Sequence, residues 1–329
     1  CDDSDGCTDT DTCQAGNCTG NQLLCLELDQ CHDVGSCGPA PNWSKGLGLL
    51  GDQFATDVTI DETGNVVVTG YFTGQMNFGA GVLAANGIDV FLAGFDPSGA
   101  LLWAQRFGNG NDQVAECVAT DGAGNVLVAG YFAGTINFGG GLLTSAGNND
   151  IFVAKFAPTG APLWSKRFGD LNNQAARDIA VDSAGNIVVT GEFAGQFSFE
   201  AGQQMVGSFG DDVFVVKFDP SGAQLWSKSF GPASNAAGQR VAVDGAGNVL
   251  LTGKFSDTID FGGGVLTSAG LADFFLAKLS PSGAPLWSKR FGGADNELRI
   301  NVATDSAGNV LATGNLRGTF DFGNGALTS

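Results

Sequence analysis

Few side chains of this 329-residue chain have the types and spacing needed for catalysis. The only histidine, His32, lies inside a cysteine-rich stretch, so no Ser-His-Asp or Cys-His arrangement can form in the rest of the chain. A pair of carboxylates remains possible, because two acids on opposite sides of a sugar can cleave a glycosidic bond. The best candidates are Asp57, Asp178 and Glu192, since their positions vary in identity between otherwise similar segments.

A second group of candidate residues suits ligand binding. Each member directly follows a recurring glycine, and the group comprises Tyr71, Tyr131, Glu192, Lys254 and Asn315. Polar and aromatic side chains thus vary within a constant framework. The variation indicates either a rim that faces a sugar or simple tolerance at exposed positions.

The N-terminal segment is strongly acidic. Eight of the 34 acidic residues lie within residues 1–37, which contain no Lys or Arg. Alternating carboxylates can bind Ca²⁺, and the candidates are Asp3, Asp5, Asp9 and Asp11. The EF-hand pattern is absent, because Cys1 occupies its first position and no distal Glu follows. A solvated linker without calcium is the alternative.

Seven of the eight cysteines are also concentrated near the N-terminus, at Cys1, Cys7, Cys13, Cys18, Cys25, Cys31 and Cys37. This density predicts disulfides in an oxidising compartment, outside the cell or on its surface. A zinc site is less favoured, because closely spaced Cys-x-x-Cys pairs are missing. Asn17 and Asn42 each begin a formal N-glycosylation sequon. The eighth cysteine, Cys117, is expected to be a packed strand residue.

The net charge of −19 argues against binding to nucleic acids or anionic membrane surfaces, which requires Lys and Arg. No run of 18 apolar residues is present, so no membrane-spanning segment is expected. The chain also begins without a signal peptide, which suggests a processed or excised product.

The candidate residues belong to a repeat of about 61 residues. The five tryptophans, Trp43, Trp103, Trp164, Trp226 and Trp287, are spaced 60, 61, 62 and 61 residues apart. The asparagines of a recurring Gly-Asn step, Asn65, Asn125, Asn186, Asn248 and Asn309, show the same intervals. Two markers in the same register indicate a repeat architecture.

Each repeat predicts four short strands joined as two hairpins. Residues 177–231 contain four apolar segments in two consecutive pairs. The two segments of each pair are joined by a turn of the form Asp-x-x-Gly. The first strand carries small residues, which suits an innermost position, and the third is apolar throughout, which suits burial on both faces. Such units favour an all-β fold, a β-propeller of four-stranded blades, over a linear solenoid.

The repeat resembles the SBBP-type β-propeller repeat of bacterial surface and secreted proteins. The motif is D-x-x-G-N-x-x-x-T-G followed by F-x-G-x-x-x-F-G, represented by Asp121, Gly124, Asn125, Gly130, Phe132, Gly134, Phe138 and Gly139. The resemblance covers about residues 40–329 and implies a fold more than a function. The N-terminal CDDSDGCTDTDTCQAGNC also resembles the acidic, Cys-rich leaders of myxobacterial-type cell-surface proteins.

Counting strands predicts how the propeller closes. The last repeat stops after two strands, whereas residues 21–29 resemble a third strand and residues 40–47 a fourth. These segments would complete a fifth blade, with a linker at residues 1–20 and the propeller at residues 21–329. A seven-bladed ring with the rest absent, or a strand supplied by another subunit, stays open.

These observations predict a non-enzymatic, extracellular structural or adhesive module. Because the two ends of the propeller would lie close together, self-association into a head-to-tail filament or tandem array is expected. The alternative is a secreted carbohydrate-binding or glycoside-cleaving β-propeller that uses cavity carboxylates, with surface glycans as partners. No cofactor is expected other than Ca²⁺ in the linker.

Overall fold

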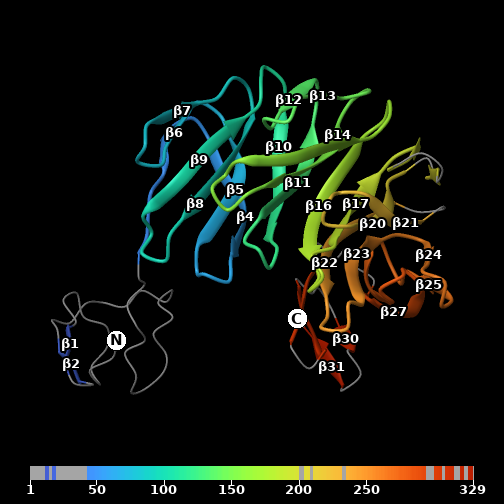
Figure 1. Ribbon diagram of the computed structural model, residues 1–329. Helices are drawn as coiled ribbons and strands as arrows, with labels where there is room; N and C mark the ends of the chain where they lie inside the picture. The colour runs from blue at the N-terminus through green and yellow to red at the C-terminus, as the bar shows by residue number, and fades with distance from the viewer. Residues whose placement is uncertain are drawn as a thin grey trace. The chain divides into compact units, whose positions relative to one another are not determined.

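The computed structural model is all-β in the residues that it describes (Figure 1). These are residues 12–14, 17–19, 43–199, 204–207, 210–231, 235–293, 300–305, 308–314, 319–321 and 325–328, with backbone alone for 12–14, 17–19, 319–321 and 326–328. No helix within them is long and apolar enough to cross a membrane. The chain divides into two compact units, Cys1–Gly46 and Leu47–Ser329, and each is described by itself.

Four repeats each form a four-stranded antiparallel sheet, as predicted, with strands A to D in chain order. The A strands are β4 (Gln53–Ile60), β10 (Gln113–Thr120), β16 (Gln174–Val181) and β22 (Ala236–Val243). The B strands are β5 (Val66–Phe72), β11 (Val126–Phe132), β17 (Ile187–Phe193) and β23 (Val249–Phe255). The C strands are β8 (Asp89–Phe95), β14 (Asp150–Phe156), β20 (Asp212–Phe218) and β26 (Asp273–Leu279). The D strands are β9 (Leu101–Phe107), β15 (Pro162–Phe168), β21 (Gln224–Phe230) and β27 (Pro285–Phe291).

Successive sheets pack face to face, and strand C shows why its sequence is continuously apolar. Every residue of β14 is buried. Phe152 and Phe156 pack in one cluster with Val90 of the first repeat, whereas Val153 packs in another with Phe214 of the third repeat. Alternate side chains of one strand therefore fill two different interfaces, as the period of two in a strand requires. Figure 1 shows the sheets following one another in chain order from blue to orange.

The turn between strands A and B is held by its aspartate. In the second repeat, Asp121 Oδ1 accepts hydrogen bonds from the backbone N–H groups of Ala123 at 3.0 Å and Asn125 at 2.9 Å. Gly124 follows with a φ of 74°, a left-handed conformation that residues with a Cβ rarely adopt. The Asp-x-x-Gly-Asn motif is therefore a turn signature, which is why it recurs in every repeat.

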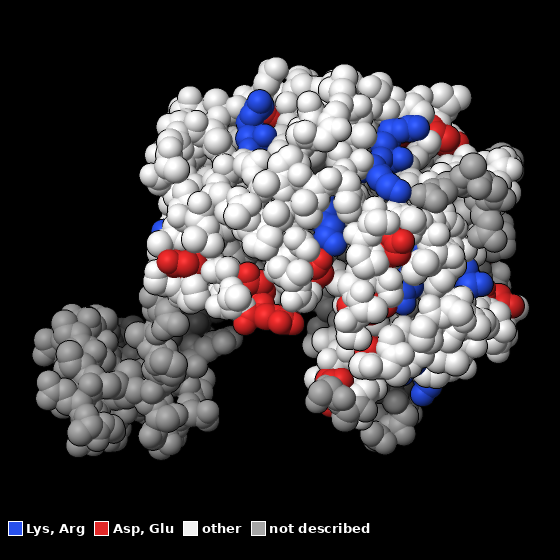
Figure 2. All heavy atoms as spheres, viewed as in Figure 1, with Lys and Arg blue, Asp and Glu red and all other residues white. Residues whose placement is uncertain are grey.

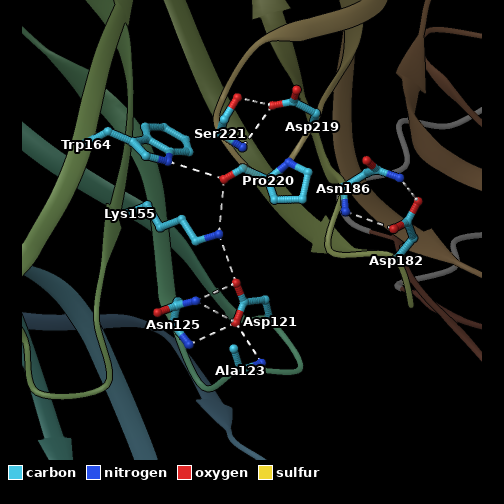
Figure 3. Close-up of polar contacts among 10 residues, drawn as sticks. All are labelled: Asp121, Ala123, Asn125, Lys155, Trp164, Asp182, Asn186, Asp219, Pro220 and Ser221. Atoms are coloured by element: carbon cyan, nitrogen blue, oxygen red, sulfur yellow. Dashed lines mark hydrogen bonds and ion pairs between the residues drawn. The ribbon is translucent and has the colours of Figure 1, made fainter.

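A buried lysine of strand C links neighbouring repeats (Figure 3). Lys155 Nζ lies 2.9 Å from Asp121 Oδ2 of its own repeat and donates to the carbonyl oxygen of Pro220 in the next repeat at 3.2 Å. Trp164 Nε1 donates to the same carbonyl at 3.4 Å. Equivalent lysine–aspartate pairs, Lys217–Asp182 and Lys278–Asp244, lie at 2.8 Å.

Tryptophans that recur once in each repeat make contacts of this kind between neighbouring repeats. In the first repeat, Gly94 occupies the position of the lysine, yet Trp103 Nε1 still donates to the carbonyl oxygen of Pro158 at 2.8 Å. Trp226 Nε1 makes the equivalent bond to Pro281 at 3.0 Å. Each of these indoles thus ties strand D to the C–D turn of the following repeat.

A second buried ion pair lies within the repeats. Asp150, at the start of β14, is fully buried and pairs with Arg167 of β15. Burial raises the pKa of Asp150, and the backbone N–H of Ala146 and the Arg167 guanidinium oppose that effect. The same pairing joins Asp89 to Arg106 and Asp273 to Arg290. Figure 2 shows few charged side chains on the face that it presents, and in several places basic and acidic side chains lie next to each other.

Short hairpins occupy the segment between strands B and C. They are β6 (Gln75–Asn77) with β7 (Val82–Ala84), β12 (Thr135–Asn137) with β13 (Leu142–Thr144), β18 (Gln196–Phe197) with β19 (Met205–Val206), and β24 (Thr258–Asp260) with β25 (Val265–Thr267). The motif phenylalanines support them, because Phe138, just after β12, is buried against Phe152 with ring centroids 4.8 Å apart.

The fifth repeat is described in part. Strands β28 (Ile300–Thr304) and β29 (Val310–Gly314) pair with each other, as do β30 (Thr319–Asp321) and β31 (Ala326–Thr328). The predicted closing strand at residues 21–29 lies outside the described residues, and so do residues 40–42.

The predicted strand at residues 40–47 is wrong for residues 43–47, which form no strand. A strand needs a partner for its N–H and C=O groups, and this segment reaches one at its end, where the N–H of Asn77 in the first repeat donates to the carbonyl oxygen of Leu47 at 3.0 Å. The chain instead enters β3 (Gly48–Leu50), which pairs with β6 of the first repeat. The compact units divide after Gly46, whereas the predicted linker ended at residue 20, and that boundary stays a prediction.

In the N-terminal unit, β1 (Thr12–Gln14) and β2 (Asn17–Thr19) form an antiparallel pair with Cys13 opposite Cys18. The candidate calcium ligands Asp3, Asp5, Asp9 and Asp11 lie outside the described residues, as does Asn42. The disulfide predictions also stay untested there, because the side chains of residues 1–42 are not described.

Candidate functional site

A β-bulge in strand A places one side chain per repeat outside the regular pairing. In the second repeat, Ala115 lies opposite Gly130 and Cys117 lies opposite Ala129, so Glu116 has no opposite residue. The residues in the same situation in the other complete repeats are Thr56, Arg177 and Gln239. A bulge of this kind re-aims a side chain that would otherwise alternate with its neighbours.

The recurring glycine of strand B lies in close contact with the backbone of strand A next to this bulge. A Cβ atom at Gly130 would lie 2.0 Å from the carbonyl oxygen of Val114, which is shorter than any real contact. Strand A can therefore approach only a glycine at this position. The approach fixes the position of the next residue, Tyr131, beside the bulged residue of the same repeat.

The bulged residues and the residues after the glycine line one pocket with a volume of about 590 Å³. The predicted ligand-binding residues Tyr71, Tyr131, Glu192 and Lys254 all belong to its wall. Ile300 and Asn301 of the fifth repeat also line it, so A strands of five repeats contribute side chains. The fifth predicted residue, Asn315, lies outside the described residues.

The bulged residues Thr56, Glu116, Arg177 and Gln239 were not among the predicted site residues, although all four line the pocket. A signal was present in the sequence, because they also differ between repeats while the residue before each of them is always Ala or Gly. It was hidden by the bulge itself, which breaks the alternation that assigns a strand residue to one face.

Arg177 organises one side of the pocket. Its guanidinium pairs with Glu116 of the second repeat and with Glu192 of its own repeat, where Nε lies 3.1 Å from Glu192 Oε1. It also lies over the ring of Tyr131, with 5.5 Å between Cζ and the ring centroid. Burial opposes the charge of Arg177, but Glu192 and Glu116 outweigh this effect and raise its pKa. Burial and the Glu116 carboxylate raise the pKa of Tyr131.

Another part of the pocket wall is aromatic. Phe54 and Tyr71 lie in the first repeat with ring centroids 5.0 Å apart and an interplanar angle of 26°, a stacked arrangement. Phe54 is 49% exposed, so the pair presents a flat apolar surface to a ligand. The pocket therefore combines aromatic faces with planar charged groups.

The two predicted strand A carboxylates do not line the pocket. Asp57 Oδ2 accepts the backbone N–H of Val118 at 2.8 Å, and Asp178 Oδ2 accepts that of Val241 at 2.7 Å. Each carboxylate thus joins its own A strand to that of the next repeat. Burial raises the pKa of Asp57, and it raises the pKa of Asp178 to about 7.

Replacing Asp178 with asparagine should remove part of the pH dependence of stability. Because burial raises the pKa of Asp178 from the usual 3.8 of an aspartate to about 7, its stabilising contribution is present below about pH 4 and lost as the pH rises through 7. We expect Asp178→Asn to be about 4 kcal/mol more stable, relative to the unmodified chain, at pH 8 than at pH 4. Chemical denaturation at both pH values measures the difference.

The exposed turn residue Asp219 provides the control, because the hydroxyl of Ser221 lowers its pKa and it titrates below this window. Asp219→Asn should leave the difference between pH 4 and pH 8 unchanged. If the difference in stability between pH 4 and pH 8 changed equally in both variants, Asp178 would not be the group that causes the pH dependence.

Cys117 is buried and is the free cysteine of the described residues. Burial, followed by the nearby carboxylates of Asp178 and Asp57, raises the pKa of its thiol well above the usual value. A thiol in this state is a poor nucleophile at neutral pH, so the packed strand role fits its surroundings. Within the described residues, no group of three or more His, Cys, Asp and Glu side chains is placed to hold a metal ion.

The repeated four-stranded sheets, whose A strands surround a shared pocket, define a β-propeller repeat protein. No protein-family profile matches the chain. The chain is 25% identical over 242 residues to an uncharacterized WD repeat-containing protein of Acanthamoeba polyphaga mimivirus. The aligned region covers 62% of this chain, and the chain spans about 17% of the length of that curated relative. The similarity agrees with the fold class.

Proposed function

We propose that the chain is a non-enzymatic, adhesive β-propeller module that binds a carbohydrate in the pocket between its A strands. One observation carries the proposal: the residues that vary from repeat to repeat after the strand B glycine converge on a single pocket. Repeats around one axis place equivalent side chains around the same cavity whatever their role, so the support comes from their chemistry: two tyrosines, a glutamate and a lysine face this pocket. A constant framework with variable residues around one cavity is the arrangement expected of a binding site.

The chemistry of the pocket favours a sugar. The stacked rings of Phe54 and Tyr71 offer a flat apolar surface for the C–H face of a pyranose. Around them lie planar groups that can exchange hydrogen bonds with hydroxyls, namely Glu116, Arg177, Glu192, Gln239 and Asn301. Several of these are already held by each other, so little rotational freedom is lost on binding.

The same geometry favours binding over cleavage. A glycosidase needs two carboxylates in separate roles, one an acid and the other a nucleophile or base. Glu116 and Glu192, the carboxylates of the pocket wall, both pair with the single guanidinium of Arg177. Asp57 and Asp178 instead accept backbone N–H groups between repeats. Neither pair offers an acid and a base that are free to act on opposite sides of a sugar.

We further propose that the ring closes with five blades, through residues 21–29 beside β29. Support comes from the two ends of the described repeats. Val58 of the first repeat is 57% exposed, whereas its equivalents Val118 and Val241 are 4% and 5% exposed. Leu311 of the fifth repeat is 55% exposed, whereas its equivalent Leu127 is fully buried. Side chains that pack against a neighbour elsewhere lack one at both ends.

The remaining parts of the proposal rest on sequence. The SBBP-type repeat and the cysteine-rich leader support an extracellular or cell-surface location with disulfides in residues 1–37. Head-to-tail self-association and calcium binding by the leader are proposed on the same basis. Electron microscopy of the native material would test the assembly, because beaded fibres support it and isolated monomers contradict it.

A glycan array probed with the full chain tests the binding function. We expect retention of at least one class of glycan, and a loss of at least tenfold in affinity for Tyr71→Ala because the stacking surface is removed, or about 1.4 kcal/mol. The variant Leu225→Ala, which truncates an exposed apolar side chain outside the pocket, should bind like the unmodified chain. Release of reducing sugar that is abolished by Glu192→Gln would contradict the non-enzymatic assignment.

A further inference from the structure

The pocket has two unlike sides. The first repeat contributes the stacked aromatic residues Phe54 and Tyr71. The third and fourth repeats contribute mainly charged residues, among them Arg177, Glu192, Arg240 and Lys254. A ligand that fits both sides needs an apolar face and a charged edge.

The basic side chains on the polar side differ in how many partners they have within the protein. Arg177 is paired with both glutamates of the pocket wall. Arg240 donates to Asn301 Oδ1 at 3.0 Å and to the backbone carbonyl of Gln239 at 2.9 Å. It also lies close enough to Asp57 and Asp178 to oppose the rise of their pKa values. Both guanidinium groups are therefore committed to the protein.

Lys254 differs from these arginines. Its side chain is exposed at the pocket wall. Among the described residues it makes no hydrogen bond and no ion pair within 4.0 Å. Asp211 is near enough for the ammonium to counteract the rise in its pKa, which burial causes, but the two do not pair. Within the part of the chain that the structure describes, Lys254 is therefore a cation at the cavity wall without a hydrogen-bond acceptor.

We propose that the ligand is an acidic sugar, a uronic acid residue whose ring lies on the aromatic side and whose carboxylate pairs with Lys254. This inference rests on the proposed carbohydrate-binding function and assigns its ligand class. A pyranose uronate has the apolar face and the charged edge that the two sides require. Glu192 neighbours Lys254 in the wall, and its ion pair with Arg177, which Glu116 shares, offsets only part of its negative charge. The pocket wall as a whole still favours an anion, because it carries three basic side chains, Arg177, Arg240 and Lys254, against these two glutamates.

The overall charge makes this local cation necessary. The chain carries a formal net charge of −19 and repels polyanions at long range. An acidic glycan can therefore bind only where a basic side chain offsets that repulsion. Recognition should depend on Lys254 and weaken as salt screens the contact.

The test compares each acid with its own methyl ester, because the ester keeps the ring and removes the charge. Isothermal titration calorimetry of the full chain is done with oligomers of galacturonate, glucuronate and mannuronate, and with the three esters. For the best oligomer we expect the acid to bind at least tenfold more tightly than its ester. In Lys254→Met that preference should fall to less than threefold.

Lys289→Met is the matched control, since Lys289 is an exposed lysine of β27 outside the pocket, and it should keep the tenfold preference. An acid and an ester that bind the unmodified chain equally would overturn the acidic-sugar inference and leave carbohydrate binding intact. A preference that survives in Lys254→Met would overturn the assignment of Lys254. If neither these oligomers nor any neutral glycan binds, the proposed function itself fails.

Discussion

Replacing Asp121 with alanine is expected to lower the free energy of unfolding by about 3–5 kcal/mol, the usual range for removing one partner of a buried ion pair. Asp121 and Lys155 have side chains only 7% and 6% exposed, and their charged atoms lie 2.9 Å apart. Without the carboxylate, the ammonium of Lys155 keeps the carbonyl oxygen of Pro220 as its acceptor and has no countercharge. The change also takes the acceptor away from the N–H groups of Ala123 and Asn125.

The first repeat contains a matched control. Asp61 makes the same turn, accepting the N–H groups of Thr63 and Asn65 at 2.9 Å. Gly94 takes the place of the lysine there, so no buried cation among the described residues depends on this aspartate. Asp61→Ala should therefore lose the turn bonds alone, about 1–2 kcal/mol. Urea denaturation followed by tryptophan fluorescence and by circular dichroism measures both variants.

The difference in the free energy of unfolding between Asp121→Ala and Asp61→Ala measures the contribution of the ion pair. Adding Lys155→Met to Asp121→Ala should recover part of the loss, because the uncompensated charge is removed along with its partner. Equal destabilisation by Asp121→Ala and Asp61→Ala would show that the turn, and not the ion pair between strand C and the turn, determines stability here.

The repeat and its turns could be predicted because they depend on local chemistry. Asp121 and Gly124 act on residues within four positions of themselves, so their spacing is visible in the sequence. The role of the tryptophans could not be predicted in the same way. Trp164 binds a carbonyl 56 residues away, and no pattern within one repeat shows which turn of the next repeat it meets.

The site was predictable in part for a related reason. Tyr131 and Glu192 could be found because they follow a fixed glycine and differ between repeats. Arg177 could not, because a bulge placed it in the pocket and a bulge leaves no periodic signal. Asp178 varies between repeats as well, but the neighbouring strand uses its carboxylate. Variation alone therefore does not distinguish a residue that meets a ligand from one that meets another repeat.

Removing residues 1–47 is expected to destabilise the protein much more than removing residues 1–20. If residues 21–29 complete the fifth blade beside β29, their loss leaves the apolar side chains at both ends of the described repeats without any neighbour to pack against. Each large apolar side chain that stays exposed loses the stabilisation of about 1.5–3 kcal/mol that its burial would contribute. Val58 and Leu311 already mark the two ends, at 57% and 55% exposed. Loss of these contacts would remove most of the 5–15 kcal/mol typical of a domain.

The shorter deletion is the control, since it removes the acidic leader and leaves the proposed closing strand in place. It should melt within a few degrees of the full chain in a single transition, whereas the longer deletion should lose its cooperative transition. Light scattering during the same experiment distinguishes closure within one chain from closure by a second copy. A full chain that is monomeric and melts independently of concentration fits the first, and a melting temperature that rises with concentration fits the second. Equal melting of both deletions would show that residues 21–47 do not close the ring, and the exposed faces of Val58 and Leu311 would then require further blades.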